Sequence, residues 1–218
     1  MLKILINYYK DFRYRIHKTK HISASYTFLL FLKIWISDRL LKLSPISASL
    51  PWMPYSTILK LNYIIKKDFN ILETGSGGSS LFYLRRCNKL TSLEHDINWL
   101  KELEKNISLT SFKKRWTVVL KQLNEKSINE SAYLQFLREQ EDESFDLISV
   151  DGRLRSESLK ICSNKVKRGG YLLLDNSDRN EYNDGIEFIN NLGWSKQDFN
   201  GFCYSLDWDS KSTIWHRD

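Results

Sequence analysis

The chain has 218 residues, of which 42% are hydrophobic and 27% charged, with 3 prolines and 9 glycines. This balance excludes wholesale disorder, a fibrous repeat and a long flexible linker, and the length suits one domain with a core that needs no disulfide support. The net charge of +7 is uneven, because residues 1–66 carry 11 basic and two acidic residues while the remainder is slightly acidic. A uniformly basic nucleic-acid-binding domain is therefore disfavoured.

Cysteine spacing and the apolar segments set the expected compartment. Cys87, Cys162 and Cys203 form no CxxC or Cys/His pattern, which gives a zinc site or a disulfide framework no support. The first residues show no secretory signal pattern, and the most apolar stretch, 26–36, is far shorter than the roughly 20 residues of a spanning helix. We therefore expect a cytoplasmic protein.

Hydrophobic spacing predicts helices in the first part of the chain and a strand–helix alternation after it. Apolar residues recur every three or four positions over 24–43, Ser44-Pro45 ends that helix, and a second helix is expected over 56–67. From there the expected strands are 69–73, 90–94, 116–120, 145–150 and 170–175, the helices that follow them are 79–87, 97–107, 128–138, 156–166 and 181–192, and the closing strands are 194–199, 202–206 and 212–216.

This alternation predicts an α/β fold. Residues 68–218 are expected to form a Rossmann-like, doubly wound, mainly parallel sheet, and residues 1–67 a basic helical extension that packs on the sheet or caps the site. The aromatic residues of the loop 51–55 are expected either to contribute to such a cap or to pack in the core. In doubly wound sheets ligands bind at the carboxyl ends of the strands.

The first expected strand ends in a glycine-rich turn, Glu73-Thr74-Gly75-Ser76-Gly77. Glycines there permit a tight turn and the close approach of a ligand to a helix N-terminus. Glu94 ends the second strand, where an acid accepts hydrogen bonds from ribose hydroxyls. An NAD site shares the glycines and this acid but does not account for Glu73. The Tyr63/Lys67 pair also precedes the glycine turn, whereas a short-chain dehydrogenase places it after the fourth strand.

In this part the sequence resembles the class I S-adenosylmethionine-dependent methyltransferases. The family's first motif matches Glu73–Gly77, the second Ser92–Asp96, the fourth Phe145–Gly152 and the next Arg168–Asn176, in order and at sensible spacing. The chain departs from the family at Ser79, where a third glycine is common. The resemblance implies S-adenosylmethionine as the cofactor.

The resemblance also implies a role for each matched position. The Gly75–Gly77 backbone, with Thr74 and Ser76, would face the methionine part of the cofactor, and Glu73 would fix the loop and the amino group. Glu94 would hold the ribose, while His95 and Asp96 would lie beside the adenine.

The fourth and fifth strands end in carboxylates, Asp151 and Asp175, and Asn176 follows the second of them. Adjacent parallel strands lie roughly 5 Å apart, so these oxygens suit a shared Mg²⁺ or Ca²⁺. The positions resemble the metal ligands of cation-dependent catechol and caffeoyl-CoA type O-methyltransferases, although Leu154 stands where those carry a catalytic lysine. The alternative is that Asp151, or as second choice Asp175, acts as the general base, or that both line the cofactor pocket.

Two further motifs have competing interpretations. Arg153 and Arg155 would clamp an anionic acceptor or belong to a solvated loop. Asp207-Trp208-Asp209 matches the Asp-x-Asp of metal-dependent glycosyltransferases, but its place between two expected strands predicts a hairpin turn.

In the basic N-terminal segment, aromatic and basic residues interleave over 8–18. This pattern suits contact with an anionic membrane surface or with a nucleic acid. The alternative is a solvated arm without a partner. The expected function is transfer of a methyl group to a small or sugar-like acceptor. Oxygen is the expected acceptor atom, and nitrogen is the second choice. Alternatives are an aminopropyltransferase and a non-catalytic binding module.

Overall fold

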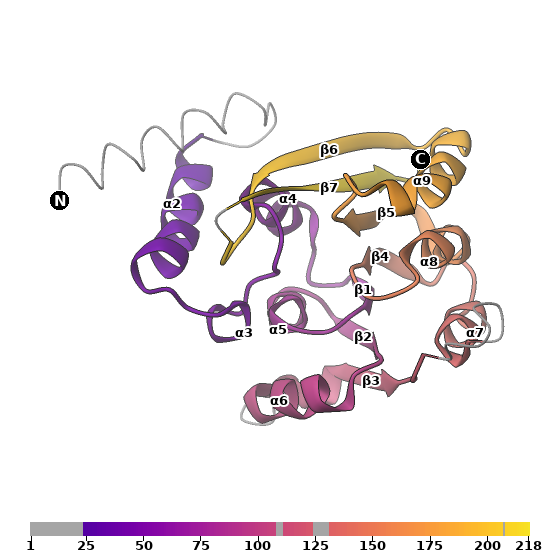
Figure 1. Cartoon of the computed structure of the whole chain (residues 1–218), viewed down its shortest axis with the longest axis horizontal. Coiled ribbons are helices and arrows are strands. Elements are labelled where there is room, and N and C mark those ends of the chain that lie inside the picture. The colour runs from indigo at the N-terminus through magenta and orange to yellow at the C-terminus, as the bar shows by residue number, and fades with distance from the viewer. Residues whose placement is uncertain (1–23, 108–110, 124–130, 207) are drawn as a thin grey trace.

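A computed structural model describes residues 24–107, 111–123, 131–206 and 208–218 of the chain. Its centre is a seven-stranded sheet in the order β3-β2-β1-β4-β5-β7-β6 (Figure 1). The strands are β1 (Asn70–Thr74), β2 (Lys89–Glu94), β3 (Trp116–Leu120), β4 (Phe145–Val150), β5 (Val166–Asp175), β6 (Ser195–Phe202) and β7 (Asp209–His216). β1 to β5 are parallel, whereas β7 is antiparallel to both β5 and β6.

Helices cover both faces of this sheet (Figure 1). One face carries α4 (Tyr55–Ile64), α5 (Gly78–Leu84) and α6 (Ile97–Ile107), and the other carries α7 (Ala132–Arg138), α8 (Arg155–Cys162) and α9 (Asn183–Asn191). The chain moves outward from β1 to β3 and returns to the other side of β1 with β4. This arrangement confirms the doubly wound α/β prediction and places the switch point, where ligands bind in such folds, between β1 and β4.

Alternating strand residues enter two hydrophobic clusters. In β1, Ile71 packs with residues of α4 and α5, whereas Leu72 packs with residues of α7 and α8. Both side chains are fully buried. Burial on both faces explains why the strands read as nearly continuous apolar runs in the sequence.

The N-terminal helices share the core of the sheet domain. They are α2 (Ala24–Trp35), a π-helical turn (Ile36–Leu40) and α3 (Pro45–Ala48). Phe31 and Tyr55 belong to the same buried cluster as Phe199 and Ile214 of the closing strands. The loop before α4 is partly in this core, since Met53 is fully buried while its neighbour Trp52 is half exposed.

The regular part of the helix expected over 24–43 ends at Trp35, where the π-helical turn begins. The cause lies outside the helix. The buried Asp38 carboxylate accepts hydrogen bonds from the Tyr55 hydroxyl and, at 3.0 Å, from the Ser205 backbone N–H. The π-helical turn contains Asp38 and so changes the direction of its side chain while the chain stays helical.

Two strands near the C-terminus differ from the sequence prediction. β5 begins at Val166 instead of residue 170, because Val166 already pairs with Phe145 of β4, and residues 167–170, with Gly169 at a positive φ, form an irregularity before Tyr171 pairs with Leu147. The strand expected over 194–199 continues through Gly201 to Phe202 as β6, whereas the strand expected over 202–206 is wrong beyond Phe202, where an isolated bridge and a turn follow.

The hairpin predicted around Asp207-Trp208-Asp209 is present, because β6 and β7 are antiparallel neighbours. Asp207 itself, the segment 8–18 and the start of the helix expected over 128–138 lie outside the described residues. Over the ranges that the structure covers, no helix has the length and apolar character needed to cross a membrane.

Candidate functional site

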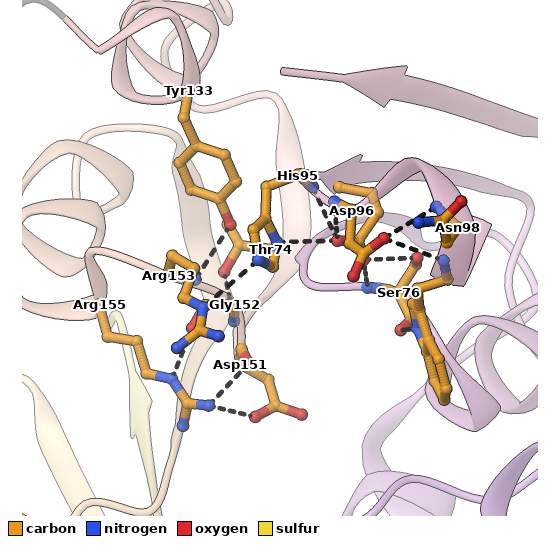
Figure 2. Close-up of polar contacts among 12 residues, drawn as sticks. Thr74, Ser76, His95, Asp96, Asn98, Tyr133, Asp151, Gly152, Arg153 and Arg155 are labelled. Carbon is orange, nitrogen blue, oxygen red and sulfur yellow. Dashed lines mark hydrogen bonds and ion pairs between the residues drawn. The ribbon is translucent and has the colours of Figure 1, made fainter. Parts of the chain in front are cut away.

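Two glycine loops meet at the switch point. Gly75 follows β1 with φ +80°, and a Cβ added there would come within 3.0 Å of the Gly152 backbone, which follows β4. A Cβ on Gly152 would lie 2.2 Å from the Tyr133 hydroxyl and 2.8 Å from the Gly75 nitrogen. The loops are also joined directly, since the Gly152 N–H donates to the Thr74 hydroxyl at 3.2 Å and the Asp151 N–H to the Thr74 carbonyl at 3.1 Å (Figure 2). Only residues without a side chain allow this contact.

We expect Gly152→Ala to lower the free energy of unfolding by about 1–3 kcal/mol, because its methyl group overlaps Tyr133 and the Gly75 backbone. Gly77→Ala is the matched control. Gly77 has an extended φ of 167°, and its nearest neighbour to an added Cβ is Trp99 at 3.6 Å, so a change within about 0.5 kcal/mol is expected. Urea denaturation of both variants measures this, and equal losses would contradict the close loop contact.

Glu73 lies beneath the glycine loop with 1% of its surface exposed. Its carboxylate accepts hydrogen bonds from the hydroxyls of Ser79 at 2.8 Å, Ser92 at 2.6 Å and Ser80. These contacts tie β1 to the first turn of α5 and to β2. The predicted contact with a cofactor amino group stays a prediction.

Glu94 is the second buried acid of the site, with 2% exposure. One carboxylate oxygen accepts from the Ser76 N–H at 2.9 Å and the Ser76 hydroxyl at 2.8 Å. The other accepts from the N–H groups of His95 at 2.7 Å and Asp96 at 2.9 Å (Figure 2). Because a carboxylate has about four lone-pair sites, a ribose hydroxyl would have to replace one of these donors, and the predicted contact of Glu94 with a ribose stays a prediction.

His95 and Asp96 occupy the turn between β2 and α6. Asp96 accepts from the N–H groups of Asn98 at 2.8 Å and Trp99 at 3.1 Å, and these bonds hold its pKa below the usual range. Asp96 therefore caps α6. His95 Nδ1 lies 2.9 Å from Glu94 without hydrogen-bond geometry, and His95 Nε2 accepts from Arg153 at 3.4 Å (Figure 2). The place of both residues beside adenine stays a prediction.

Arg155, at the start of α8, joins the ends of β4 and β5. Its side chain is 10% exposed and donates hydrogen bonds to the carbonyls of Gly152 at 2.9 Å, Asp151 at 2.7 Å and Asp175 at 2.7 Å, and to Asn176 Oδ1 at 3.1 Å. It also forms an ion pair with the Asp151 carboxylate at 2.9 Å (Figure 2). An arginine has five N–H donors, so this one is fully engaged. We therefore correct the expectation that Arg155 clamps a substrate.

The predicted metal ligands do not fit a divalent cation. Two of them, Asp151 and Asn176, hold the Arg155 guanidinium, and the third, Asp175, accepts a hydrogen bond from the Ser212 hydroxyl at 2.6 Å. A metal ion placed there would meet a fixed positive charge at short range. Within the described parts of the chain, no group of three histidine, cysteine or acidic residues is arranged to hold a metal. The Mg²⁺ or Ca²⁺ hypothesis therefore has no support in this arrangement.

Burial changes the pKa of three acids at this edge. It raises the pKa of Glu73 from 4.5 to about 7 and, together with the charge of Asp151, that of Asp175 from 3.8 to about 8. Burial also raises the pKa of Asp151, although the Arg155 charge opposes the rise. The Asp151 side chain is 26% exposed, whereas Asp175 as a whole is 2% exposed. Asp151 is therefore the more accessible base.

The raised pKa values predict that stability falls with rising pH. Between the ordinary pKa of 3.8 and the folded value of about 8, folded Asp175 keeps a proton that the unfolded chain has lost. The unfolding midpoint at pH 8 should therefore lie several degrees below that at pH 6. Asp175→Asn should flatten this slope, and Asp178→Asn, at an exposed position, should not. Thermal unfolding monitored by circular dichroism checks this, and an unchanged slope in Asp175→Asn would contradict it.

Sequence reasoning missed several residues of this site. Trp99 donates its indole N–H to the Ser76 carbonyl at 2.5 Å and so holds the glycine loop from α6. Tyr133, fully buried in α7, accepts from the Arg153 N–H at 3.4 Å (Figure 2). The serines around Glu73 were visible as a cluster in the sequence, but Tyr133 lies in no motif and only the return of α7 to the switch point places it there.

No protein-family model and no curated protein sequence matches the chain. Solved structures do match, among them an O-methyltransferase of Bacillus cereus in complex with SAH, at a TM-score of 0.53 and 16% identity over 68% of this chain and 74% of that one. Precorrin-8w decarboxylase of Methanobacterium thermoautotrophicum matches at 0.53 and 16%, over 71% and 83%.

Spermidine synthase of Thermotoga maritima is a further match, at a TM-score of 0.53 and 17% identity over 71% of this chain. The match covers 54% of that enzyme, so this chain spans about half its aligned partner's length. At such low identity the likeness concerns the fold alone. The strand order, the antiparallel β7 and these neighbours together show that the chain has the fold of the class I S-adenosylmethionine-dependent methyltransferases.

Proposed function

We propose that this chain is an S-adenosylmethionine-dependent methyltransferase that acts on an oxygen of a small or sugar-like acceptor. The observation that carries the proposal is the joint position of the Gly75–Gly77 loop and the Glu94 carboxylate at the carboxyl ends of β1 and β2, beside the switch point. Several neighbours of the same fold are O-methyltransferases. The buried free cysteines suit the reducing cytoplasm in which we place the enzyme.

The residues present fit the cofactor at both ends. The close contact of Gly75 with Gly152 leaves bare backbone at the switch point, and Glu94 offers a buried carboxylate to a diol. When bound, the cofactor supplies a methyl group on a positively charged sulfur. The protein's part is to align the acceptor and to take its proton.

Asp151 is our candidate for the base. Arg155 holds one carboxylate oxygen, Oδ1, which fixes the orientation of the group while the side chain stays 26% exposed. The raised pKa of Asp151 brings it closer to neutral pH and makes it a better proton acceptor. The exposed Arg153, with only a long contact to His95, remains available to an anionic acceptor.

Asp151→Asn is expected to abolish turnover and to weaken cofactor binding only modestly, because the amide keeps the shape of the carboxylate but cannot accept the proton. Acceptor screening with radiolabelled S-adenosylmethionine measures turnover, and isothermal titration with S-adenosylhomocysteine measures binding. Asp146→Asn, on the far end of β4, is the control and should leave both unchanged. Unchanged turnover in Asp151→Asn would remove Asp151 from this role.

Cofactor titration also tests the proposal against its alternatives. The proposal requires that S-adenosylmethionine or S-adenosylhomocysteine binds. The spermidine synthase neighbour makes aminopropyl transfer the second candidate, which requires preference for the decarboxylated cofactor. Failure of all three ligands to bind would leave a non-catalytic binding module.

A further inference from the structure

An apolar groove runs between the N-terminal helices and the C-terminal end of α5, away from the site described above. Its volume of about 740 Å³ falls in the range of ligand pockets. Nine leucine, isoleucine and alanine side chains from α2, the π-helical turn, α3 and their connections line it. A groove of this size and composition accepts a hydrocarbon chain better than a polar ligand.

Some of the leucines that line the groove are largely exposed to solvent. Leu29 and Leu41, which line it, are 65% and 61% exposed, and Leu40, outside the lining, is 48% exposed. Exposed leucines that line an apolar groove are candidates for burial against a partner or a membrane. An occupant confined to the groove would leave Leu40, which is outside the lining, in water, so we infer an apolar surface that extends beyond the groove, as a bilayer does.

The charged residues of the groove are all basic. Lys33, Arg85 and Arg86 line it, and none of its described lining residues is acidic. Arg86 is oriented by hydrogen bonds to Asn62 Oδ1 at 2.8 Å and the Phe82 carbonyl at 2.9 Å, while Lys33 and Arg85 are exposed. Charge complementarity therefore calls for an anionic head on the apolar occupant.

We propose that this groove seats an acyl chain of an anionic membrane lipid and so docks the protein on a membrane surface. Burial of the exposed leucines and attraction between the basic residues and anionic headgroups are the two contributions on which the strength of peripheral attachment depends. The inference stands on the described groove alone, independently of the segment 8–18 and of the proposed methyl transfer.

Docking here would bring the candidate site to the membrane. Ala48 of α3 lines the groove, and the same helix packs on Gly78 at the start of α5, where an added Cβ would meet the carbonyl oxygens of Leu50 at 2.2 Å and Pro45 at 2.4 Å. α3 and the residues around it therefore contact both the groove and the start of α5, which directly follows the glycine loop.

The test is sedimentation of the full chain with two kinds of vesicle, phosphatidylcholine alone and phosphatidylcholine mixed with phosphatidylglycerol. We expect at least about tenfold stronger partitioning to the anionic vesicles, and a loss of about tenfold in Leu29→Asp, Leu41→Asp and Arg85→Glu. Leu192→Asp, at a 45% exposed leucine after α9, and Lys101→Glu on α6 are the matched controls and should partition like the unmodified chain.

Each other outcome overturns the proposal. Loss in Arg85→Glu alone would mean adsorption by charge without an inserted chain. Leucine variants that lose thermal stability but still sediment with vesicles would mean that the protein itself fills the groove. Binding of monomeric short-chain phosphatidylglycerol without vesicle binding would mean a soluble amphiphile. Equal loss in the control variants would mean that no particular face docks.

Discussion

Replacing Glu94 by glutamine is expected to weaken binding of S-adenosylhomocysteine by about 100-fold, because hydrogen bonds to a charged acceptor contribute about 1.5–3 kcal/mol and the ribose would lose a carboxylate. The Glu94 carboxylate also accepts the N–H groups of Ser76, His95 and Asp96, and an amide nitrogen facing those donors would loosen the glycine loop. Isothermal titration measures the affinity, and thermal unfolding shows whether the variant is folded.

Two further variants isolate the cause of that loss. Ser76→Ala removes the hydroxyl that occupies Glu94 but keeps the Ser76 N–H contact, so binding should be unchanged or tighter. Glu104→Gln, an exposed position on α6, should change nothing. Full affinity in a folded Glu94→Gln variant would show that the ribose does not bind this carboxylate and would count against the proposed function.

Arg155→Ala is expected to lower the unfolding midpoint by about 10 °C, because removing one partner of a largely buried ion pair costs about 3–5 kcal/mol and each kcal/mol shifts a domain of this size by about 2–4 °C. The substitution would leave the carbonyls of Asp151 and Asp175 and the Asn176 amide oxygen without their donor. Turnover should be lost as well, since Asp151 loses the group that orients it.

Arg153→Ala is the matched control two residues away. Its side chain makes one 3.4 Å contact with His95, so its stability should change by less than about 0.5 kcal/mol. Arg155→Lys should recover only part of the stability, because an ammonium cannot serve the fork of acceptors that a guanidinium does. An unchanged midpoint in Arg155→Ala would restore the interpretation of Arg155 as a free clamp.

Arg153 and Arg155 have different contacts that the sequence motif does not predict. Both follow Asp151 in the sequence and look equivalent there. In the structure Leu154 adopts a left-handed conformation with φ 50° before α8 begins, and this turn directs Arg155 to the ends of β4 and β5 while Arg153 faces His95. The predicted metal site failed for the same reason, because its ligands were identified correctly as neighbours but the cation among them is a side chain of this chain.

The sequence by itself determined the alternation of strands and helices from β1 to α9. Apolar runs of strand length alternate with helical spacing, and glycines and acids fall where strands end, because both patterns are local consequences of burial and turn geometry. The doubly wound sheet and the positions of Glu73, Glu94, Asp151 and Asp175 at its carboxyl edge followed from these patterns.

Only the tertiary structure decided what each of those side chains contacts. Glu73 meets Ser92 across two strands, Asp175 meets Ser212 across β5 and β7, and Tyr133 reaches Gly152 from α7. Such contacts join residues far apart in the chain and depend on strand order and register. Hydrophobic periodicity in the sequence therefore does not predict them. The groove below α2 has the same origin, since its walls come from segments that are adjacent only after folding.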